Sequence, residues 1–159
     1  METLLKNVLL AKFDCSPTAK YEFNKESVIK ALTEGTFIKR IADGIAFGEY
    51  DQSVVARECE KSHEPDYRVT TINMELVSHR VVDIYFRNLR TDNGTLDVIY
   101  VYGDVLPCGP KAHAINPHRM DRVFGFRALV GDRHDKESGR FIRELKTLVA
   151  IDYCPNGVV

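Results

Sequence analysis

Two groups of cysteine and histidine residues carry side chains that could bind a metal ion. Cys59 and His63 are four residues apart, and Cys108, His113 and His118 follow one another at intervals of five. A structural zinc site needs about four such ligands that converge, and known fingers supply them as closely spaced pairs. The chain lacks those pairs. We therefore expect unrelated surface histidines and buried thiols, with no metal and no cofactor.

Covalent catalysis by a thiol is a second chemistry to consider. Cys108 stands beside a glycine-proline turn and is the best candidate nucleophile, with His63 or His79 as the base. A reactive thiol needs a pKa lowered by a neighbouring base or cation, which spacing alone does not show. His79 lies inside a predicted strand, where we expect a partly buried ring bonded to backbone. A hydrolase built on these residues, or on one of the serines, is kept as an alternative.

Four aromatic residues of the central strands could stack on nucleobases, as sheet surfaces of RNA-binding domains do: Tyr85, Phe86, Tyr100 and Tyr102. The chain has no matching basic stripe, and its 22 basic and 23 acidic residues give a net charge of −1. Core or interface packing is the expected use of these rings. The charge balance supports neither a nucleic-acid partner nor an anionic membrane.

Length and composition are those of one globular domain. A chain of 159 residues, 44% hydrophobic and 28% charged, can bury roughly 70% of its unfolded surface around a single core spanning residues 1–159. Its four cysteines are scattered, the N-terminus resembles no secretion signal, and the longest apolar runs are too short to span a bilayer. These features favour a reducing cytoplasm and free thiols.

The candidate residues are positioned by a predicted long β-hairpin from Val77 to Val105. Apolar and aromatic residues alternate with polar ones on both arms, and Asp92-Asn93-Gly94 lies between them. Asn and Gly tolerate the positive φ of a tight primed turn, whose twist matches the flanking strands. Because both faces carry apolar side chains, we expect other elements to cover them.

The remaining segments predict one clear helix, several strands and a long loop. Asn24 is placed to cap a helix over 25–34, and Gly35 to end it. Strands are expected at 8–13, 44–48, 123–129 and 141–153, and polar loops at 49–67 and 132–140. Within the first loop, Val54 to Cys59 could supply a helical turn, because so long a loop is unusual unless it is functional, partly helical or disordered. In the last strand one face should carry Leu145, Thr147, Val149, Ile151 and Tyr153. The sum is an α+β domain: a mainly antiparallel, barrel-like sheet with a few short flanking helices.

Taken in order, six short pieces resemble the prohead (capsid maturation) proteases of tailed bacteriophages, whose domain is similar to the herpesvirus assembly protease barrel. They match, in turn, the first helix, a Gly-Glu-Leu-Asp-His stretch, a Val-Ser-His strand, a proline-glycine-lysine turn, a Gly-x-Ser-Ser-Arg-Gly stretch and the closing strand. The matching pieces are Val28–Leu32, Gly48–Gln52, Val77–Tyr85, Val105–Lys111, Gly125–Leu129 and Leu145–Tyr153.

The sequence departs from the family pattern at the positions of the general base and the nucleophile. Gln52 stands in place of the family's general-base histidine, and an amide cannot accept a proton at neutral pH. The nucleophilic serine falls at Arg127 or Ala128, neither of which can attack a carbonyl. A shift of the alignment inside the long loop would place His63 at the base position and would still supply no serine.

The resemblance implies a catalytically degenerate phage protein made in the host bacterial cytoplasm or associated with the virion. Such a protein would act by binding: to capsid, scaffold or the active protease in head assembly, to a host factor, or to a second copy as a homodimer. Glu49, Asp51, Gln52 and Arg127 are the expected binding residues, with an Arg127 ion pair to Glu49 or Asp51 as the plainer role. An active peptidase with relocated residues and a virion or small-ligand-binding β-domain are the alternatives.

Overall fold

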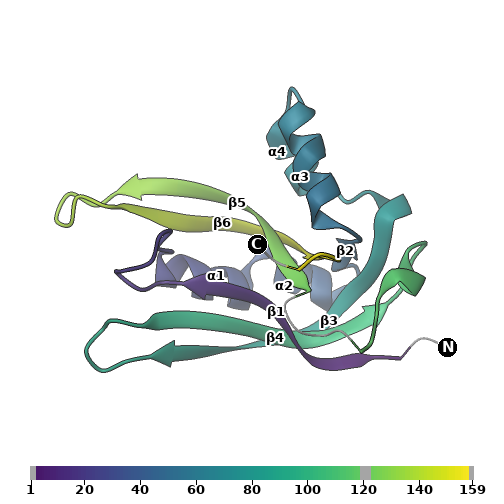
Figure 1. The fold of residues 1–159 in the computed structure, drawn as a ribbon, viewed down its shortest axis with the longest axis horizontal. Helices are drawn as coiled ribbons and strands as arrows, with labels where there is room; N and C mark the ends of the chain where they lie inside the picture. The colour runs from purple at the N-terminus through teal and green to yellow at the C-terminus, as the bar shows by residue number, and fades with distance from the viewer. Residues whose placement is uncertain (1–2, 119–122, 158–159) are drawn as a thin grey trace.

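The computed structural model describes residues 3–118 and 123–157, which form two antiparallel sheets flanked by short helices (Figure 1). The four-stranded sheet has the order β1-β4-β3-β2, and β5 pairs with β6 in a second sheet. The strands are β1 Leu5–Asp14, β2 Phe47–Glu49, β3 Val77–Arg90, β4 Asp97–Pro107, β5 Phe124–His134 and β6 Phe141–Tyr153. The expected α+β class, dominated by a curled, barrel-like antiparallel sheet, is confirmed.

The central hairpin forms as predicted, with a different turn. β3 and β4 pair from His79 opposite Pro107 to Arg90 opposite Asp97. The turn spans Thr91 to Leu96, where Gly94 has a φ of +73° and donates from its N–H to the Thr91 carbonyl. Asn93 is not among the residues with positive φ, and its side chain accepts from the Thr95 N–H. Only the glycine therefore needs the left-handed conformation.

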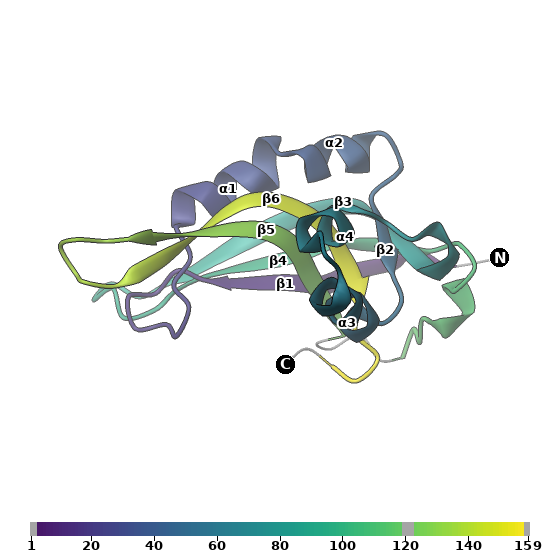
Figure 2. The ribbon, with the colours of Figure 1, turned by 90° about the horizontal axis from the view of Figure 1, so that it is seen from above.

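Two helices cover one side of the sheets (Figure 2). Asn24 caps α1 (Lys25–Glu34) by accepting from the Ser27 N–H at 2.9 Å, and the helix buries Val28, Ala31 and Leu32. This confirms the predicted helix and its cap. α2 (Thr36–Ala42) follows at once and buries Phe37. Both helices contact β6, so they cover the core from that side.

The segment 49–67, predicted to be a polar loop with a helical turn at 54–59, contains most of two helices that project from the sheets (Figure 1). α3 spans Gln52–Lys61 and α4 spans Pro65–Thr70. Val55 is the only buried residue of α3, and α4 has none. The expected helical turn at 54–59 lies inside α3. The full helices were not predicted because the segment contains few apolar residues and buries only Val55.

Two irregularities in the β5–β6 pairing change which side chains of β6 face the core. Pairing skips Lys146 and Val149, so that Leu129 opposes Thr147 while Val130 opposes Leu145. Each bulge reverses the alternation that follows it. The main core cluster therefore takes Leu145, Leu148, Ile151 and Tyr153. Three of the five predicted residues lie in it, Val149 is buried outside it, and the prediction that all five share one face was wrong. β5 also runs to His134, into the predicted loop 132–140.

The two sheets meet around one hydrophobic core. Tyr50, directly after β2, forms an isolated bridge with Tyr153 at the end of β6, and β1 contacts β5. Between them the rings of Phe13 and Phe126 lie 4.5 Å apart, and Phe23 contacts both. Across the described ranges no helix is long and apolar enough to cross a membrane.

Candidate functional site

Gln52 lies directly beside the β5 segment that holds Arg127. Its Nε2 donates to the carbonyl of Phe126 at 2.9 Å, and its Oε1 accepts from Cys154 Sγ at 3.5 Å. A Cβ added to Gly125 would come within 2.9 Å of Gln52 Oε1. The structure thus brings together the two stretches that the alignment pairs.

The backbone before Gln52 explains how its side chain reaches β5. Asp51 adopts a left-handed conformation, with φ of +67°, and its carboxylate accepts from the Ser53 N–H at the start of α3. Such a conformation is costly for a non-glycine residue and persists only where the surroundings impose it. Asp51 therefore serves as a helix cap that turns Gln52 toward the sheet. Both ends of the Gln52 amide are engaged, and neither can take up a proton.

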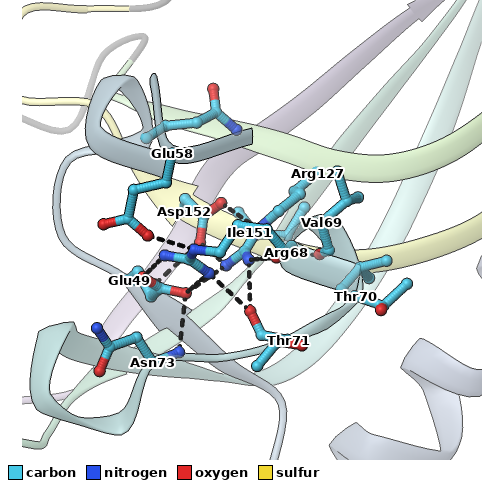
Figure 3. A network of polar contacts seen from close by, with 12 residues as sticks. Glu49, Glu58, Arg68, Val69, Thr70, Thr71, Asn73, Arg127, Ile151 and Asp152 are labelled. Atoms are coloured by element: carbon cyan, nitrogen blue, oxygen red, sulfur yellow. Dashed lines mark hydrogen bonds and ion pairs between the residues drawn. The ribbon is translucent and has the colours of Figure 1, made fainter. Parts of the chain in front are cut away.

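Arg127 is buried and every nitrogen of its guanidinium has a partner (Figure 3). Nε and Nη2 form a bidentate pair with Asp152, both at 2.9 Å, and Nη2 also lies 3.0 Å from Glu49. Nη1 donates to the Thr71 carbonyl at 2.9 Å. The ion pair with Glu49 is present, whereas Asp51 is used as a cap. A guanidinium so fully engaged has no donor left for a ligand.

Arg68, at the end of α4, completes the network from the other side. Its Nη2 and Nη1 contact the two oxygens of Glu49 at 2.8 and 3.1 Å, and its Nε contacts Glu58 on α3. Nη1 also donates to the Thr71 carbonyl at 2.8 Å. Two guanidiniums therefore share one buried carboxylate, and the second carboxylate, on Asp152, balances their charge.

Glu49 is fully buried and remains ionised. Burial alone would raise its pKa, but hydrogen bonds from Arg68 and from the Asn73 N–H, together with the charge of Arg127, hold the pKa below its ordinary value of 4.5. The Glu49 N–H in turn donates to Asp152 at 2.9 Å. Within residues 3–118 and 123–157, no buried polar side-chain atom lacks a partner. The cluster of Glu49, Arg68, Arg127 and Asp152 is called the charge cluster below.

Ser78 and His79 form a second buried polar pair, on β3. His79 Nε2 lies 2.7 Å from the Ile151 carbonyl, and Ser78 Oγ lies 2.8 Å from His79 Nδ1. A carbonyl can only accept, so Nε2 carries the proton and the serine hydroxyl donates to Nδ1. Burial lowers the pKa of His79 to about 4, against the smaller opposing effects of Ile151 and Asp152. Both side chains are 0% exposed, so no substrate carbonyl reaches them.

The other predicted residues lie apart from one another. His63 is exposed in the connection between α3 and α4, Cys108 follows the end of β4, and Ala128 packs against the core. The thiol nearest to Gln52 is Cys154, and burial raises its pKa to about 12, which keeps it protonated. In the part of the chain that the structure describes, no three His, Cys, Asp or Glu residues are grouped to hold a metal.

The aromatic residues of the hairpin divide between its two faces. Phe86 packs against the core, while Tyr85 and Tyr102 stack on the outside with ring centroids 5.8 Å apart. Arg87 lies 6.0 Å from the Tyr102 ring. The four rings therefore do not form one continuous platform.

Sequence reasoning missed Arg68, Asp152, Ser78 and Cys154. Asp152 did carry a signal, because it interrupts the apolar run from Leu148 to Tyr153, where a charge must be paired to be buried. Arg68 carried none, since it lies in a polar segment whose helix was not predicted.

A model of the Peptidase S80 family matches residues 5–158. The chain therefore belongs to the Peptidase S80 family, the phage prohead protease family, and the predicted resemblance is confirmed. No match was found among curated proteins or solved structures.

Proposed function

We propose that this prohead-protease-like phage protein is a single domain that binds other proteins and does not cleave them. The observation that carries the proposal is the engagement of Gln52 and Arg127. The family resemblance places the base at Gln52 and the nucleophile at Arg127 or Ala128. Gln52 is bonded to the β5 backbone and Arg127 to two buried carboxylates. Neither residue can perform proton transfer or nucleophilic attack.

The nearby hydroxyl and thiol groups give no substitute for the missing nucleophile. Ser78 has a neutral histidine as partner, but both are sealed in the core. Cys154 lies against Gln52 rather than a base, and its raised pKa disfavours the thiolate. A covalent step needs a nucleophile and base that share one accessible site.

The outer edge of β5 supports the binding part of the proposal. Among the described strands, β5 pairs only with β6. The Phe126 carbonyl points away from β6, because it accepts from Gln52, and the backbone groups of Ala128 and Val130 follow it to the same edge by alternation. Val130 is 41% exposed. An extended peptide can add to such an edge as a third strand.

The family suggests which proteins would supply that strand. Capsid, scaffold and the active protease are the partners in head assembly; a host factor is the other class, and a homodimer would use the same edge. Each places the protein in the infected bacterial cytoplasm or on the virion. Affinity capture of the tagged protein during infection, with mass spectrometry, separates these partners: capsid proteins or the protease indicate assembly, and a host protein indicates interference with the host.

The binding edge is tested with peptides that tile the phage capsid, scaffold and protease sequences, measured by fluorescence anisotropy. Val130→Pro removes one outward N–H and should weaken binding of the best peptide at least tenfold. Val130→Thr keeps both the N–H and the branched shape and should bind as wild type does. Equal binding by the proline variant, or no binding by any peptide, would overturn the proposal.

An active peptidase with relocated residues is the competing function, favoured only by the 2.8 Å contact of Ser78 and His79. Serine- and cysteine-directed covalent probes distinguish the two. We expect no labelling above a denatured control. Labelling of one residue that disappears when that residue is replaced would establish the enzyme.

A further inference from the structure

The helices α3 and α4 form an arm, residues 52–70, that is attached to the sheets by polar contacts. Val55 is its one buried residue among the elements described, and Tyr67 of α4 is 67% exposed. Figure 1 shows both helices standing away from the sheets. An element that buries so little apolar surface gains little from the hydrophobic effect.

The contacts that replace apolar packing converge on the end of α4 (Figure 3). Arg68 reaches from the arm into the charge cluster and holds Glu49 through two hydrogen bonds. In the opposite direction, Arg127 of β5 donates to carbonyls at the carboxyl end of α4, at residues 68, 69 and 71. A cation is favourable where a helix ends in unpaired carbonyls.

The base of the arm is tied to the same strand. Gln52, the first residue of α3, holds the Phe126 carbonyl, and Cys154 lies behind it, within hydrogen-bonding distance of Gln52. The start of the arm is therefore bonded to Phe126 of β5, and the end of the arm is bonded to the neighbouring residue, Arg127. The open part of the β5 edge begins at the next residue, Ala128.

We propose that Arg68 is a positioning residue that latches the arm against β5 and so fixes where the open edge begins. With the arm in place, an added strand must stop at Ala128. With the arm released, the edge lengthens to include the Phe126 backbone. This inference rests on the proposed function for its purpose, because it describes regulation of the same binding edge; the latch itself is testable without any peptide.

The first test measures hydrogen exchange of the intact protein by mass spectrometry. Arg68→Ala should speed exchange of amides in residues 62–71 at least tenfold and leave the β3–β4 hairpin unchanged, and Arg68→Lys should fall between Arg68→Ala and wild type. Glu58→Gln gives a milder change, since Glu58 contacts Arg68 from the exposed side. Glu60→Gln, exposed on the same helix, is its matched control.

The second test measures the rate at which a maleimide reagent labels Cys154, mapped by mass spectrometry. Release of the arm uncovers this thiol, so Arg68→Ala and Glu58→Gln should both speed its labelling. Cys15 is the internal control, because burial likewise raises its pKa to about 12 and it lies just after β1. Cys154 should respond at least tenfold in Arg68→Ala and Cys15 should not.

Unchanged exchange in the arm would overturn the latch. Faster exchange of α4 with Cys154 still protected would overturn it too, because α3 would have stayed in place. If Arg68→Ala unfolds generally, the maleimide will label both Cys154 and Cys15 faster in that variant. The milder variant Glu58→Gln then distinguishes the two cases. Faster labelling of Cys154 alone in Glu58→Gln supports the latch, and unchanged labelling of Cys154 in Glu58→Gln overturns it. If no peptide bound, the hydrogen-exchange and labelling results would still be interpretable. The latch and the proposed binding function can therefore be rejected independently of each other.

Discussion

The side-chain amide of Gln52 donates to the carbonyl of Phe126 at 2.9 Å, one residue before Arg127. The proposed alignment places the family's base at Gln52 and its nucleophile at Arg127 or Ala128. In the structure the Gln52 amide is bonded to the β5 backbone, and the Arg127 guanidinium pairs with two buried carboxylates, Glu49 and Asp152.

Arg127→Ser supplies a hydroxyl and should restore no cleavage, because Gln52 cannot act as its base. It should instead lower the free energy of unfolding by about 3–5 kcal/mol, since Glu49 and Asp152 lose a buried partner. Urea denaturation measures this loss. Arg133→Ser, whose side chain pairs with Glu144 at the surface, is the matched control and should change stability by less than about 0.5 kcal/mol. Similar losses in both variants would contradict the role of Arg127.

His79 makes stability depend on pH between about 6.5 and about 4. Its pKa is lowered in the folded protein, so the unfolded chain binds more protons there, and stability is complete above pH 6.5 and declines as the pH falls toward 4. The full effect is about 3 kcal/mol. Urea denaturation at a series of pH values measures it. His79→Gln should flatten this part of the curve, and an unchanged slope would show that another group is responsible.

Glu49 governs a more acidic range. Because its folded pKa lies below 4.5, its contribution is complete above that pH and is lost as the pH falls through the lower folded value. Glu49→Gln should destabilise the protein at pH 7 and reduce the remaining acid dependence below pH 4.5. Denaturation curves of this variant are compared with those of Glu60→Gln, at the surface, which should match wild type. The idea fails if Glu49→Gln keeps the full acid transition.

Gly48 tests how closely β2, β3 and β6 approach. An added Cβ would lie 2.0 Å from the Ile151 carbonyl oxygen and 2.3 Å from His79 Nε2. Gly48→Ala should therefore cost about 3 kcal/mol or more in thermal or urea unfolding. Gly94→Ala, in an open turn with positive φ, should cost only about 1 kcal/mol. Equal costs would argue against the close approach.

Helix α1 and the β3–β4 hairpin were predicted from residues that are close together in the sequence. The Asn24 cap and the apolar positions of α1 lie within a few residues of one another, and the long hairpin alternates along its own length. Of the arm, only a helical turn at 54–59 was expected, because α3 and α4 contain few apolar residues and bury only Val55. The core face of β6 was missed because its bulges depend on pairing with β5.

The site was predictable only where the family alignment reached it. That alignment placed Gln52 near Arg127, and in the structure Gln52 bonds to the carbonyl of the preceding residue, Phe126. Of the two ion pairs considered for Arg127, to Glu49 or to Asp51, the structure contains the one to Glu49. Binding of a partner by Glu49, Asp51, Gln52 and Arg127 stays a prediction. Arg68 and Asp152, which complete the charge cluster, are separated from it in sequence and became visible only with the fold.

The absence of cleavage is tested by incubating the native protein with the phage capsid and scaffold proteins and measuring their intact masses. We expect unchanged masses, with no new termini beyond those in a heat-inactivated control. Cleavage products that require the native protein, and that vanish when one of its residues is replaced, would contradict this expectation.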